Sequence, residues 1–338
     1  MRAVMFRGPD KPIALETVPD PTPGPGELIL KVGRCGICGS DVRLTEQHGW
    51  YLIDTALGHE YAGEVVAMGA GVDDYKIGDI VTGMPSAGCG QCRPCVEGLP
   101  LFCKHPEKMI NCTGAFAEYV RTVGRTSVKL PSSLSMADGA LVEPLAVGLH
   151  GVALAKMPPG ARVLVTGAGG IGLAAAYWAR KLGAGKMAVI ARSRKKEQEA
   201  LHIGADAFIL TGENEVEEVK AALGGQPDVV FECIGVQGGL AQAINHVRTD
   251  GTVISLGFCT KPDPVLPALA TWKQVHLIFS MAYSLGEFQA TADMLDRGHL
   301  EPRAWVGDPI PLVAVPDKIM NMRVNGSTEV KVQVDPWL

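Results

Sequence analysis

The sequence of 338 residues has no uninterrupted apolar stretch of the roughly 18 residues that a membrane-spanning helix needs. Its first residues, MRAVMFRG, lack the apolar segment of a secretory signal peptide. The formal net charge is −5, and the longest basic run, RSRKK at 192–196, is too short to follow a phosphate backbone. These absences argue against a membrane, secreted or nucleic-acid-binding protein, so we expect a cytoplasmic protein with neither membrane nor nucleic-acid partners.

The composition predicts a packed, soluble protein. Hydrophobic residues make up 47% of the chain and charged residues 20%, which is the balance of a globular fold. The length is too great for one ordinary compact domain and fits two. Nine cysteines are present, an odd number, and four of them fall between 89 and 103. This clustering indicates metal binding in preference to a disulfide framework.

From about residue 161 the chain alternates short β-rich runs with helical stretches, which is typical of βαβ units and a parallel sheet. The predicted strands are 161–166, 186–191, 206–210, 228–233, 252–257 and 275–280. The predicted helices between them are near 170–182, 194–203, 215–223 and 237–247. The fold class predicted for this part is α/β, with a doubly wound parallel sheet of six strands.

The first 145 residues show a different pattern. Glycine and proline are frequent there, and turn signals such as PDPTPGPG at 19–26 interrupt short strands. This indicates an antiparallel, barrel-like β domain. After the sheet we expect one helix starting at 285–288, then loops and a last strand at 329–334, all packing back on the first domain. The predicted boundaries are 1–146, 147–284 and 285–338.

The strongest motif is a group of four cysteines in one loop, spaced C-x-x-C-x-x-C and then seven residues before the last. Four thiolates around one tetrahedral ion are what structural zinc requires, and such a closed site leaves no position for a substrate. Two disulfides and an iron–sulfur cluster are the alternatives. The predicted structural zinc ligands are Cys89, Cys92, Cys95 and Cys103.

The second motif is GAGGIG at 167–172, directly after a predicted strand and at the start of a predicted helix. Gly167, Gly169 and Gly172 match the G-x-G-x-x-G template, with Gly170 and Ile171 inside it. Glycines there allow backbone N–H groups to approach a pyrophosphate at the helix N-terminus. The alternative is a tight turn without a ligand, but the βαβ units that follow favour a dinucleotide site.

The end of the next strand predicts which dinucleotide binds. NAD-binding proteins have an acidic residue there, which hydrogen-bonds the adenosine ribose and would repel a 2′-phosphate. This sequence instead has Ala191, followed by Arg192, Ser193, Arg194, Lys195 and Lys196. Cations beside a hydroxyl suit a phosphate, so NADP is predicted, although the same residues also fit a solvated first turn of a helix.

A third set of residues is dispersed along the chain: Cys38, His59, Glu60 and Glu143. A thiolate, an imidazole and a carboxylate suit catalytic zinc with one position left for substrate. Spacing alone leaves other interpretations open. His59 fits a buried core histidine equally well, and Glu143 before Pro144 fits the start of a helix.

Over nearly its whole length the sequence resembles the zinc-dependent medium-chain alcohol dehydrogenase family. The resemblance rests on CGICGSD, GHEYAGEVVAMGAGV, the four cysteines, GAFAEYV, LVEPLAVGLHGV and GAGGIG, all in the family's order. It implies a GroES-like catalytic domain for 1–146 and an NADP-binding Rossmann domain for 147–284. A glutamate in the EPLAV segment is similar to the polyol, butanediol and threonine dehydrogenase branch.

The resemblance also implies residue roles. Cys38, His59 and either Glu60 or Glu143 hold the catalytic zinc, while Ser40 matches the hydroxyl that passes the substrate proton to the nicotinamide ribose. The family often continues this relay with a histidine where this sequence has Arg43, and His48 is a candidate replacement. Cys35 is expected to be a buried thiol.

The implied activity is hydride transfer between an alcohol or carbonyl compound and NADP(H), in a homodimer or homotetramer. Similar polyol dehydrogenases carry an Arg-Tyr pair where Ser280 and Met281 follow Phe279, so a less polar substrate is favoured. The segment 50–53, WYLI, lies where the family's substrate loop lies, and fits either that loop or core packing. The alternatives are an NAD-dependent polyol or butanediol dehydrogenase, a zinc-free quinone or enoyl reductase, and a non-enzymatic NADPH-binding protein.

Overall fold

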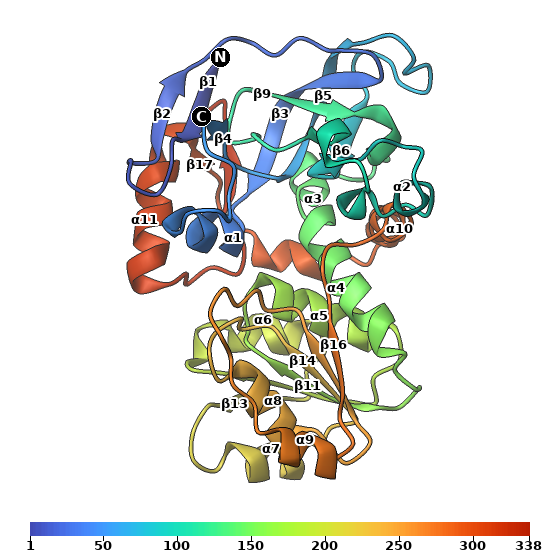
Figure 1. Ribbon diagram of the computed structural model, residues 1–338, viewed down its shortest axis with the longest axis vertical. Helices are drawn as coiled ribbons and strands as arrows, with labels where there is room; N and C mark the ends of the chain where they lie inside the picture. The colour runs from blue at the N-terminus through green and yellow to red at the C-terminus, as the bar shows by residue number, and fades with distance from the viewer. The chain divides into compact units, whose positions relative to one another are not determined.

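The computed structural model describes all 338 residues, and the chain divides into two compact units (Figure 1). Unit 1 comprises Met1–Glu143 together with Ser284–Leu338, and unit 2 comprises Pro144–Tyr283. The chain therefore leaves unit 1 once, builds unit 2 from one continuous segment, and returns to unit 1.

Unit 2 is built on one parallel sheet of six strands in the order β13-β12-β11-β14-β15-β16. This is the 3-2-1-4-5-6 order of doubly wound dinucleotide-binding folds, and the prediction of six strands is confirmed to within two residues at each end. The strands are β11 (Arg162–Thr166), β12 (Lys186–Ala191), β13 (Ala207–Leu210), β14 (Val229–Glu232), β15 (Thr252–Ser255) and β16 (His276–Phe279).

Helices cover both faces of this sheet (Figure 1). They are α5 (Gly170–Lys181), α6 (Glu197–His202), α7 (Glu215–Leu223), α8 (Gly239–His246) and α9 (Pro267–Trp272). On one face Val219 of α7 and Ala243 of α8 pack against Leu164 and Val230 of the central strands. The helix predicted at 194–203 is a 3-10 turn, Arg194–Lys196, followed by the shorter α6.

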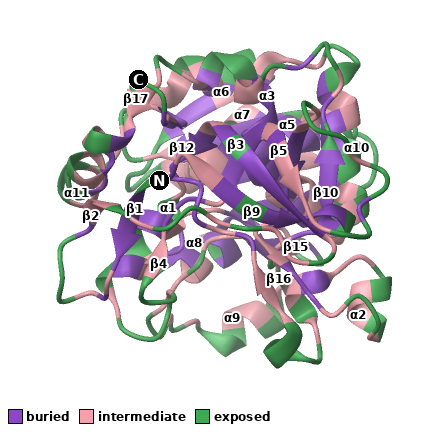
Figure 2. Cartoon of the chain, turned by 90° about the horizontal axis from the view of Figure 1, so that it is seen from above, coloured by how far each residue is buried: buried purple, intermediate pink, exposed green.

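The long strand β3 (Glu27–Gly36) is the centre of unit 1. It pairs antiparallel with β5 (Glu60–Met68), β9 (Tyr119–Val123) and β18 (Gln333–Asp335). Figure 2 shows most of β3 in the colour of buried residues. The seven-stranded sheet runs β10-β6-β5-β3-β18-β17 with β9 on β3, beside smaller sheets β2-β1-β4 and β7-β8. The predicted antiparallel β domain is thus present.

The remaining elements of unit 1 are short. Its other strands are β1 (Arg2–Phe6), β2 (Ala14–Thr17), β4 (Thr55–Ala56), β6 (Ile80–Gly83), β7 (Ser86–Ala87), β8 (Ile110–Asn111), β10 (Ser127–Lys129) and β17 (Ile310–Pro311). Its helices are α1 (Gly39–Arg43), α2 (Arg93–Val96), α3 (Met136–Gly139), α10 (Leu285–Asp296) and α11 (Val315–Asn325), while α4 (Val142–Ala155) continues into unit 2.

The prediction of a single C-terminal helix was wrong, because α11 follows α10. Val315 and Ile319 of α11 are buried and Met322 packs partly buried against the same core, so its apolar stripe is only two turns long in a segment rich in polar residues. The strand predicted at 329–334 is the shorter β18, and Lys331 before it forms only an isolated bridge with Val306.

One helical segment, Met136–Ala155, is long and apolar enough by composition to cross a membrane. However, 72% of its most apolar window is buried inside the protein. Trp178 of α5 donates from Nε1 to the carbonyl of Leu145 at 2.8 Å, which holds α4 against α5. The segment therefore has the packing of a core helix.

Candidate functional site

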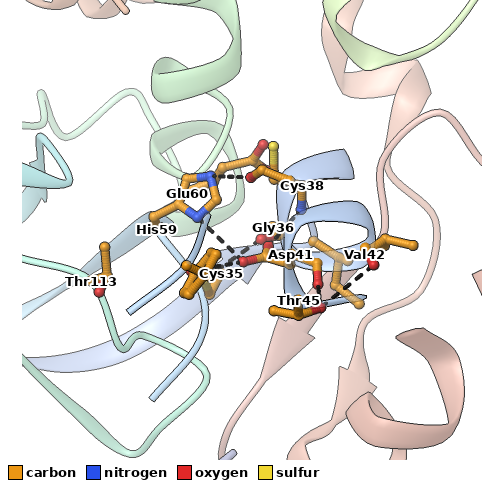
Figure 3. Close-up of polar contacts among 12 residues, drawn as sticks. Cys35, Gly36, Cys38, Asp41, Val42, Thr45, His59, Glu60 and Thr113 are labelled. Carbon is orange, nitrogen blue, oxygen red and sulfur yellow. Dashed lines mark hydrogen bonds and ion pairs between the residues drawn. The ribbon is translucent and has the colours of Figure 1, made fainter. Parts of the chain in front are cut away.

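Cys38, His59 and Glu60 form a cluster in unit 1, with their ligand atoms all within 4.8 Å of one another (Figure 3). Cys38 is the N-cap of α1, and His59 and Glu60 lie where β5 begins. The preceding Gly58 has φ +92°, and a Cβ there would lie 2.7 Å from the Phe116 side chain. A glycine at 58 is thus required to turn His59 toward Cys38.

Asp41 holds two members of this cluster in place, a role that sequence reasoning missed. Its Oδ2 accepts the N–H of Cys38 at 2.9 Å, and its Oδ1 lies 3.4 Å from Nδ1 of His59. The hydroxyl of Tyr51 donates to the same carboxylate at 3.2 Å. The only sequence signal for Asp41 was its place three residues after the N-cap, where an acidic side chain closes a capping box.

The imidazole of His59 is oriented by these contacts. With Nδ1 facing Asp41, Nε2 faces the cluster and lies 3.4 Å from the hydroxyl of Ser40. Burial lowers the pKa of His59, but the charges of Asp41 and Cys38 outweigh it and raise this pKa well above its usual value. With Nδ1 held by Asp41, Nε2 is the ring nitrogen that faces Cys38 and Glu60 as a possible metal ligand.

Lys331 is the second residue that sequence reasoning missed. Its ammonium donates to both oxygens of Glu60 at 2.6 Å and to the carbonyl of Ile37 at 3.5 Å. Both side chains are buried, and a Cβ on Gly36 would lie 2.1 Å from Oε2 of Glu60. No local pattern links residues 271 positions apart, so only the pairing of β18 with β3 reveals this contact.

Glu143 lies close to this cluster but outside the group that shares 4.8 Å. It is 6% exposed, and its charge contributes to the raised pKa of Lys331, which burial by itself would lower and Glu60 raises most. Cys38, Glu60 and Glu143 thus all lie near one buried ammonium. A thiol, an imidazole and a carboxylate in one cluster are the donor types of zinc.

The four cysteines of the loop also converge on one point. The Sγ–Sγ distances are 3.5 Å for Cys92–Cys95, 3.8 Å for Cys92–Cys103 and 4.0 Å for Cys89–Cys95. Sulfurs bound tetrahedrally at 2.3 Å to one zinc ion lie about 3.8 Å apart, whereas a disulfide needs about 2.05 Å. The arrangement fits zinc and excludes disulfides among these residues.

Backbone N–H donors favour the thiolate form of two of these cysteines. The N–H of Lys104 lowers the pKa of Cys92 to about 6, and the N–H of Gln91 lowers that of Cys89. Burial instead raises the pKa of Cys95 to about 12. The surroundings thus favour the thiolate form for Cys89 and Cys92.

In unit 2 the motif GAGGIG forms the turn between β11 and α5. Gly167 has φ +97°, which favours glycine, and Gly169 is the N-cap of α5. A Cβ on Gly172 would lie 1.8 Å from the carbonyl oxygen of Gly167, whereas one on Gly169 would meet nothing within 4 Å. Gly170 and Ile171 lie in the first turn of α5, so backbone N–H groups are presented at its start.

The end of β12 is followed by basic residues and a serine, with no carboxylate among them. Ala191 is the last residue of β12, the exposed Arg192 follows, and Ser193 caps the 3-10 turn Arg194–Lys196. The first carboxylate after the strand is Glu197, which accepts a hydrogen bond from Arg194 at 2.5 Å.

Two family models match the chain. The alcohol dehydrogenase GroES-like domain matches residues 24–132, and the zinc-binding dehydrogenase model matches residues 170–297. A sorbitol dehydrogenase of Bacillus subtilis is 34% identical over 255 residues, which cover 72% of each chain. The chain belongs to the zinc-dependent medium-chain alcohol dehydrogenase family.

Other members of the family agree with this assignment. A sorbitol dehydrogenase of Gallus gallus is 35% identical over 76% of this chain and 75% of its own. A structure of a Sinorhizobium meliloti protein described as a zinc-binding dehydrogenase, bound to NADP, has a TM-score of 0.89 and 32% identity over 99% of both chains. The structure of 2R,3R-butanediol dehydrogenase from Bacillus subtilis has a TM-score of 0.85 and 28% identity over 99% of both chains.

Membership of the medium-chain alcohol dehydrogenase family confirms three predictions. The fold class is a Rossmann doubly wound sheet together with a GroES-like β domain. The protein is an oxidoreductase enzyme that uses zinc and a nicotinamide dinucleotide. The alternatives of a zinc-free reductase and of a non-enzymatic binding protein are thereby set aside.

The predicted substrate segment divides into two parts. Trp50, Leu52 and Ile53 are 47%, 63% and 61% exposed, whereas Tyr51 packs edge-on against Phe6 of the core. Three apolar side chains in this segment are therefore partly exposed at the surface. His48 lies at the surface, where its Nε2 is 3.1 Å from Oδ2 of Asp10.

Proposed function

We propose that the chain transfers a hydride between an alcohol, or the corresponding aldehyde or ketone, and NADP(H). The cluster of Cys38, His59 and Glu60 carries this proposal, because a thiolate, an imidazole and a carboxylate are donors that catalytic zinc takes. When bound, zinc supplies Lewis acidity toward the substrate oxygen. The chain's own residues hold the donors, orient the substrate and accept its proton.

Within this proposal Glu60 is the third zinc ligand, after Cys38 and His59. Glu60 shares the 4.8 Å group, whereas Glu143 does not. Because Lys331 holds both oxygens of Glu60, this carboxylate must turn partly away from the ammonium to reach an ion. Cobalt-substituted E60Q and E143Q variants separate the two glutamates: the visible spectrum is expected to change strongly in E60Q and little in E143Q, and the reverse result assigns the role to Glu143.

Ser40 is the proposed acceptor of the substrate proton. Its hydroxyl lies 3.4 Å from Nε2 of His59, beside the metal-binding cluster. A hydroxyl there can take a proton from a bound alcohol and pass it on through the nicotinamide ribose. His48 as the outlet of this relay stays a prediction, since it pairs with Asp10 at the surface.

NADP is the proposed cofactor in preference to NAD. Support comes from Ala191 in place of an acidic residue and from the exposed Arg192 beside Ser193 at the end of β12. The relative from Sinorhizobium meliloti, which aligns over 99% of the chain, is described as bound to NADP.

A secondary or aromatic alcohol is the proposed substrate class. The exposed Trp50, Leu52 and Ile53 offer apolar contacts, and Ser280 and Met281 follow Phe279 where related polyol dehydrogenases carry a cation. A polyol is the second candidate, because several relatives, including those of Bacillus subtilis and Gallus gallus, are sorbitol dehydrogenases.

The proposed assembly is a homodimer or homotetramer, located in the cytoplasm. The edge strand β16 has unpaired backbone groups on its outer side, and Phe279 on it and Trp272 nearby are 67% and 85% exposed. Light scattering is expected to give a multiple of 35.7 kDa that F279E reduces. Nine cysteines without a disulfide support a reducing compartment.

The test of the proposed function is the initial rate of coenzyme reduction on secondary alcohols, diols, polyols and aromatic primary alcohols, with NADP and NAD in parallel. We expect NADP-dependent turnover on the apolar alcohols that is lost on chelation and restored by zinc. Faster turnover with NAD contradicts the cofactor assignment, and turnover on polyols alone contradicts the substrate class.

A further inference from the structure

Glu232 is a buried carboxylate at the centre of unit 2. It is the last residue of β14 and is 2% exposed. β14 lies directly beside β11 in the middle of the sheet, where the strand order reverses. In open α/β folds ligands bind at the carboxyl ends of the strands at this reversal, so Glu232 stands at the expected edge of the dinucleotide site.

Unlike most buried carboxylates, Glu232 is held by uncharged donors. Its Oε1 accepts the N–H groups of Ile234 and Gly235, each at 2.8 Å, and Ser255 donates to Oε2 at 3.4 Å. A buried carboxylate is destabilising unless it is hydrogen-bonded. These bonds satisfy the carboxylate and also fix the backbone of 234–235. The side chain thus folds back onto the loop that follows its own strand.

Glycines on neighbouring loops leave room for this carboxylate. A Cβ on Gly257 would lie 2.6 Å from its Oε2, and a Cβ on Gly239 would lie 3.0 Å from its Oε1. Gly235 has φ +64°, and a Cβ there would lie 2.6 Å from the N of Phe258. The loops after β14 and β15 are therefore packed backbone to backbone around one side chain.

The loop that Glu232 fixes contacts the dinucleotide-binding turn. A Cβ on Gly167 would lie 3.0 Å from Cγ1 of Ile234 and 3.4 Å from the carbonyl of Cys233. The N–H of Cys233 donates to the carbonyl of Thr166 at 3.0 Å, which joins the ends of β14 and β11. The 233–235 loop therefore lies beside the turn at 167–172, at the point where the strand order reverses.

We propose that Glu232 is a positioning residue for the nicotinamide half of the cofactor, a role that rests on the proposed function. Doubly wound folds consist of two mononucleotide-binding halves, and the half that begins with β11 holds the adenosine part through the end of β12. The half that begins with β14 holds the other mononucleotide. Glu232 shapes the carboxyl ends of β14 and β15 and so sets where the nicotinamide ring lies.

The test compares a complete cofactor with a fragment that lacks nicotinamide. Binding of NADPH and of adenosine 2′,5′-bisphosphate is measured by calorimetry for wild type, E232A and E232Q. E232A is expected to bind NADPH about tenfold more weakly, because the backbone of 234–235 is no longer held beside the nicotinamide half, with the fragment affinity unchanged. E232Q keeps an acceptor for the two N–H groups and is expected to recover most of the NADPH affinity.

D228N is the matched control. Asp228 directly precedes β14, at the amino end of this strand. It accepts hydrogen bonds from the N–H of Arg162 at 2.8 Å and from Nε of Arg248 at 2.6 Å. Its loss is expected to lower the thermal midpoint without changing either affinity. If E232A fails to fold, E232D, whose shorter side chain cannot reach both N–H groups, is expected to show the same split between NADPH and the fragment.

Failure of the proposed function and failure of the role of Glu232 give different binding results. Wild type that binds neither NADPH nor NADH contradicts the proposed function itself. Wild type that binds NADH in preference is tested with NADH and ADP-ribose. Equal weakening of cofactor and fragment in E232A and E232D, or no weakening of either, overturns the positioning role of Glu232.

Discussion

The two units place their functional residues in different ways. In unit 2 the candidate cofactor residues lie in consecutive βα turns, at 167–172 and 191–196. In unit 1 the candidate catalytic cluster joins Cys38, His59, Glu60 and Lys331, and two of these are 271 positions apart. A parallel sheet gathers loops at one edge by its topology, whereas an antiparallel domain brings residues together through long-range strand pairing.

Unit 1 also contains a candidate metal site whose ligands lie close together in the sequence. The four-cysteine loop lies within 89–103 and closes on itself, although it belongs to the same unit as the dispersed cluster. A metal site of local ligands can be lost without moving the sheet, whereas loss of the dispersed cluster affects the strands that hold it. The comparison can be tested by variants in each region.

The largest effect is expected from C38S, which removes a thiolate of the dispersed cluster. We expect kcat/KM to fall by about a thousandfold, since a Lewis acid contributes several kcal/mol. The zinc content is expected to fall from about two ions per chain to about one, measured by atomic emission. Retained activity with unchanged zinc would show that Cys38 is not a ligand.

K331M is expected to lower the free energy of unfolding, because it removes a buried contact between distant parts of the sequence. Removing one partner of a buried ion pair leaves the charge of Glu60 without its ammonium, so the free energy of unfolding should fall by about 3 kcal/mol in urea titration. The control K318M breaks the more exposed pair of Lys318 and Glu329, whose side chains are 25% and 42% exposed, and should lose under about 1 kcal/mol. Equal losses in both variants would mean that Glu60 finds another partner.

C92S is expected to act locally. The loop should lose its zinc and about 2 kcal/mol of stability, with new proteolytic cleavage between 86 and 111. Cofactor binding in unit 2 should stay as in wild type, measured by NADPH fluorescence. Loss of cofactor binding would show that the four-cysteine site supports more than its own loop.

R192A is expected to change only the choice of cofactor. Loss of one cation at the 2′-phosphate should reduce the ratio of kcat/KM for NADP over NAD by about tenfold. R194A is the control, because Arg194 is hydrogen-bonded to Glu197 and should change the ratio less. An unchanged ratio in R192A would place the phosphate contact on other residues.

The smallest effect is expected from His246 in α8 of unit 2. Burial lowers its pKa, despite Glu215 at 3.2 Å, while the charge of Lys273 lowers it further. The unfolded chain therefore binds more protons, and stability is present above pH 6.5 and is lost as pH falls through the folded pKa. The thermal midpoint of wild type should fall from pH 7.5 to 5.5 by more than that of H246Q, and parallel curves would exclude this contribution.

The fold of unit 2 was predictable because its signals are local. Each strand is a continuous apolar run bounded by turn residues, and all six lie within two residues of their predicted places. The C-terminal segment was harder, because the apolar stripe of α11, formed by Val315, Ile319 and Met322, is only two turns long. The prediction of one helix there missed this short stripe.

For the candidate sites, too, the residues with local sequence patterns were predictable and the others were not. Cys89, Cys92, Cys95 and Cys103 were identified by spacing, and the structure adds that their Sγ atoms lie at distances that suit zinc. Cys38 and His59 were recognised from motifs, but Asp41, which bonds to both, carried only the weak signal of a capping position. Glu232 was not singled out, because the acidic residue that the cofactor pattern uses lies at the end of β12, whereas Glu232 ends β14.

By itself the sequence determined the order of strands and helices in unit 2, the glycine turn, the basic end of β12 and the four-cysteine loop. Each of these depends on residues within a few turns of chain, where dihedral preferences and spacing act directly. Only the tertiary structure decided that Lys331 neutralises Glu60 and that Glu232 fixes the loop beside Gly167. The first contact requires β18 beside β3 and the second requires β14 beside β11, so neither follows from residues that are close together in the sequence.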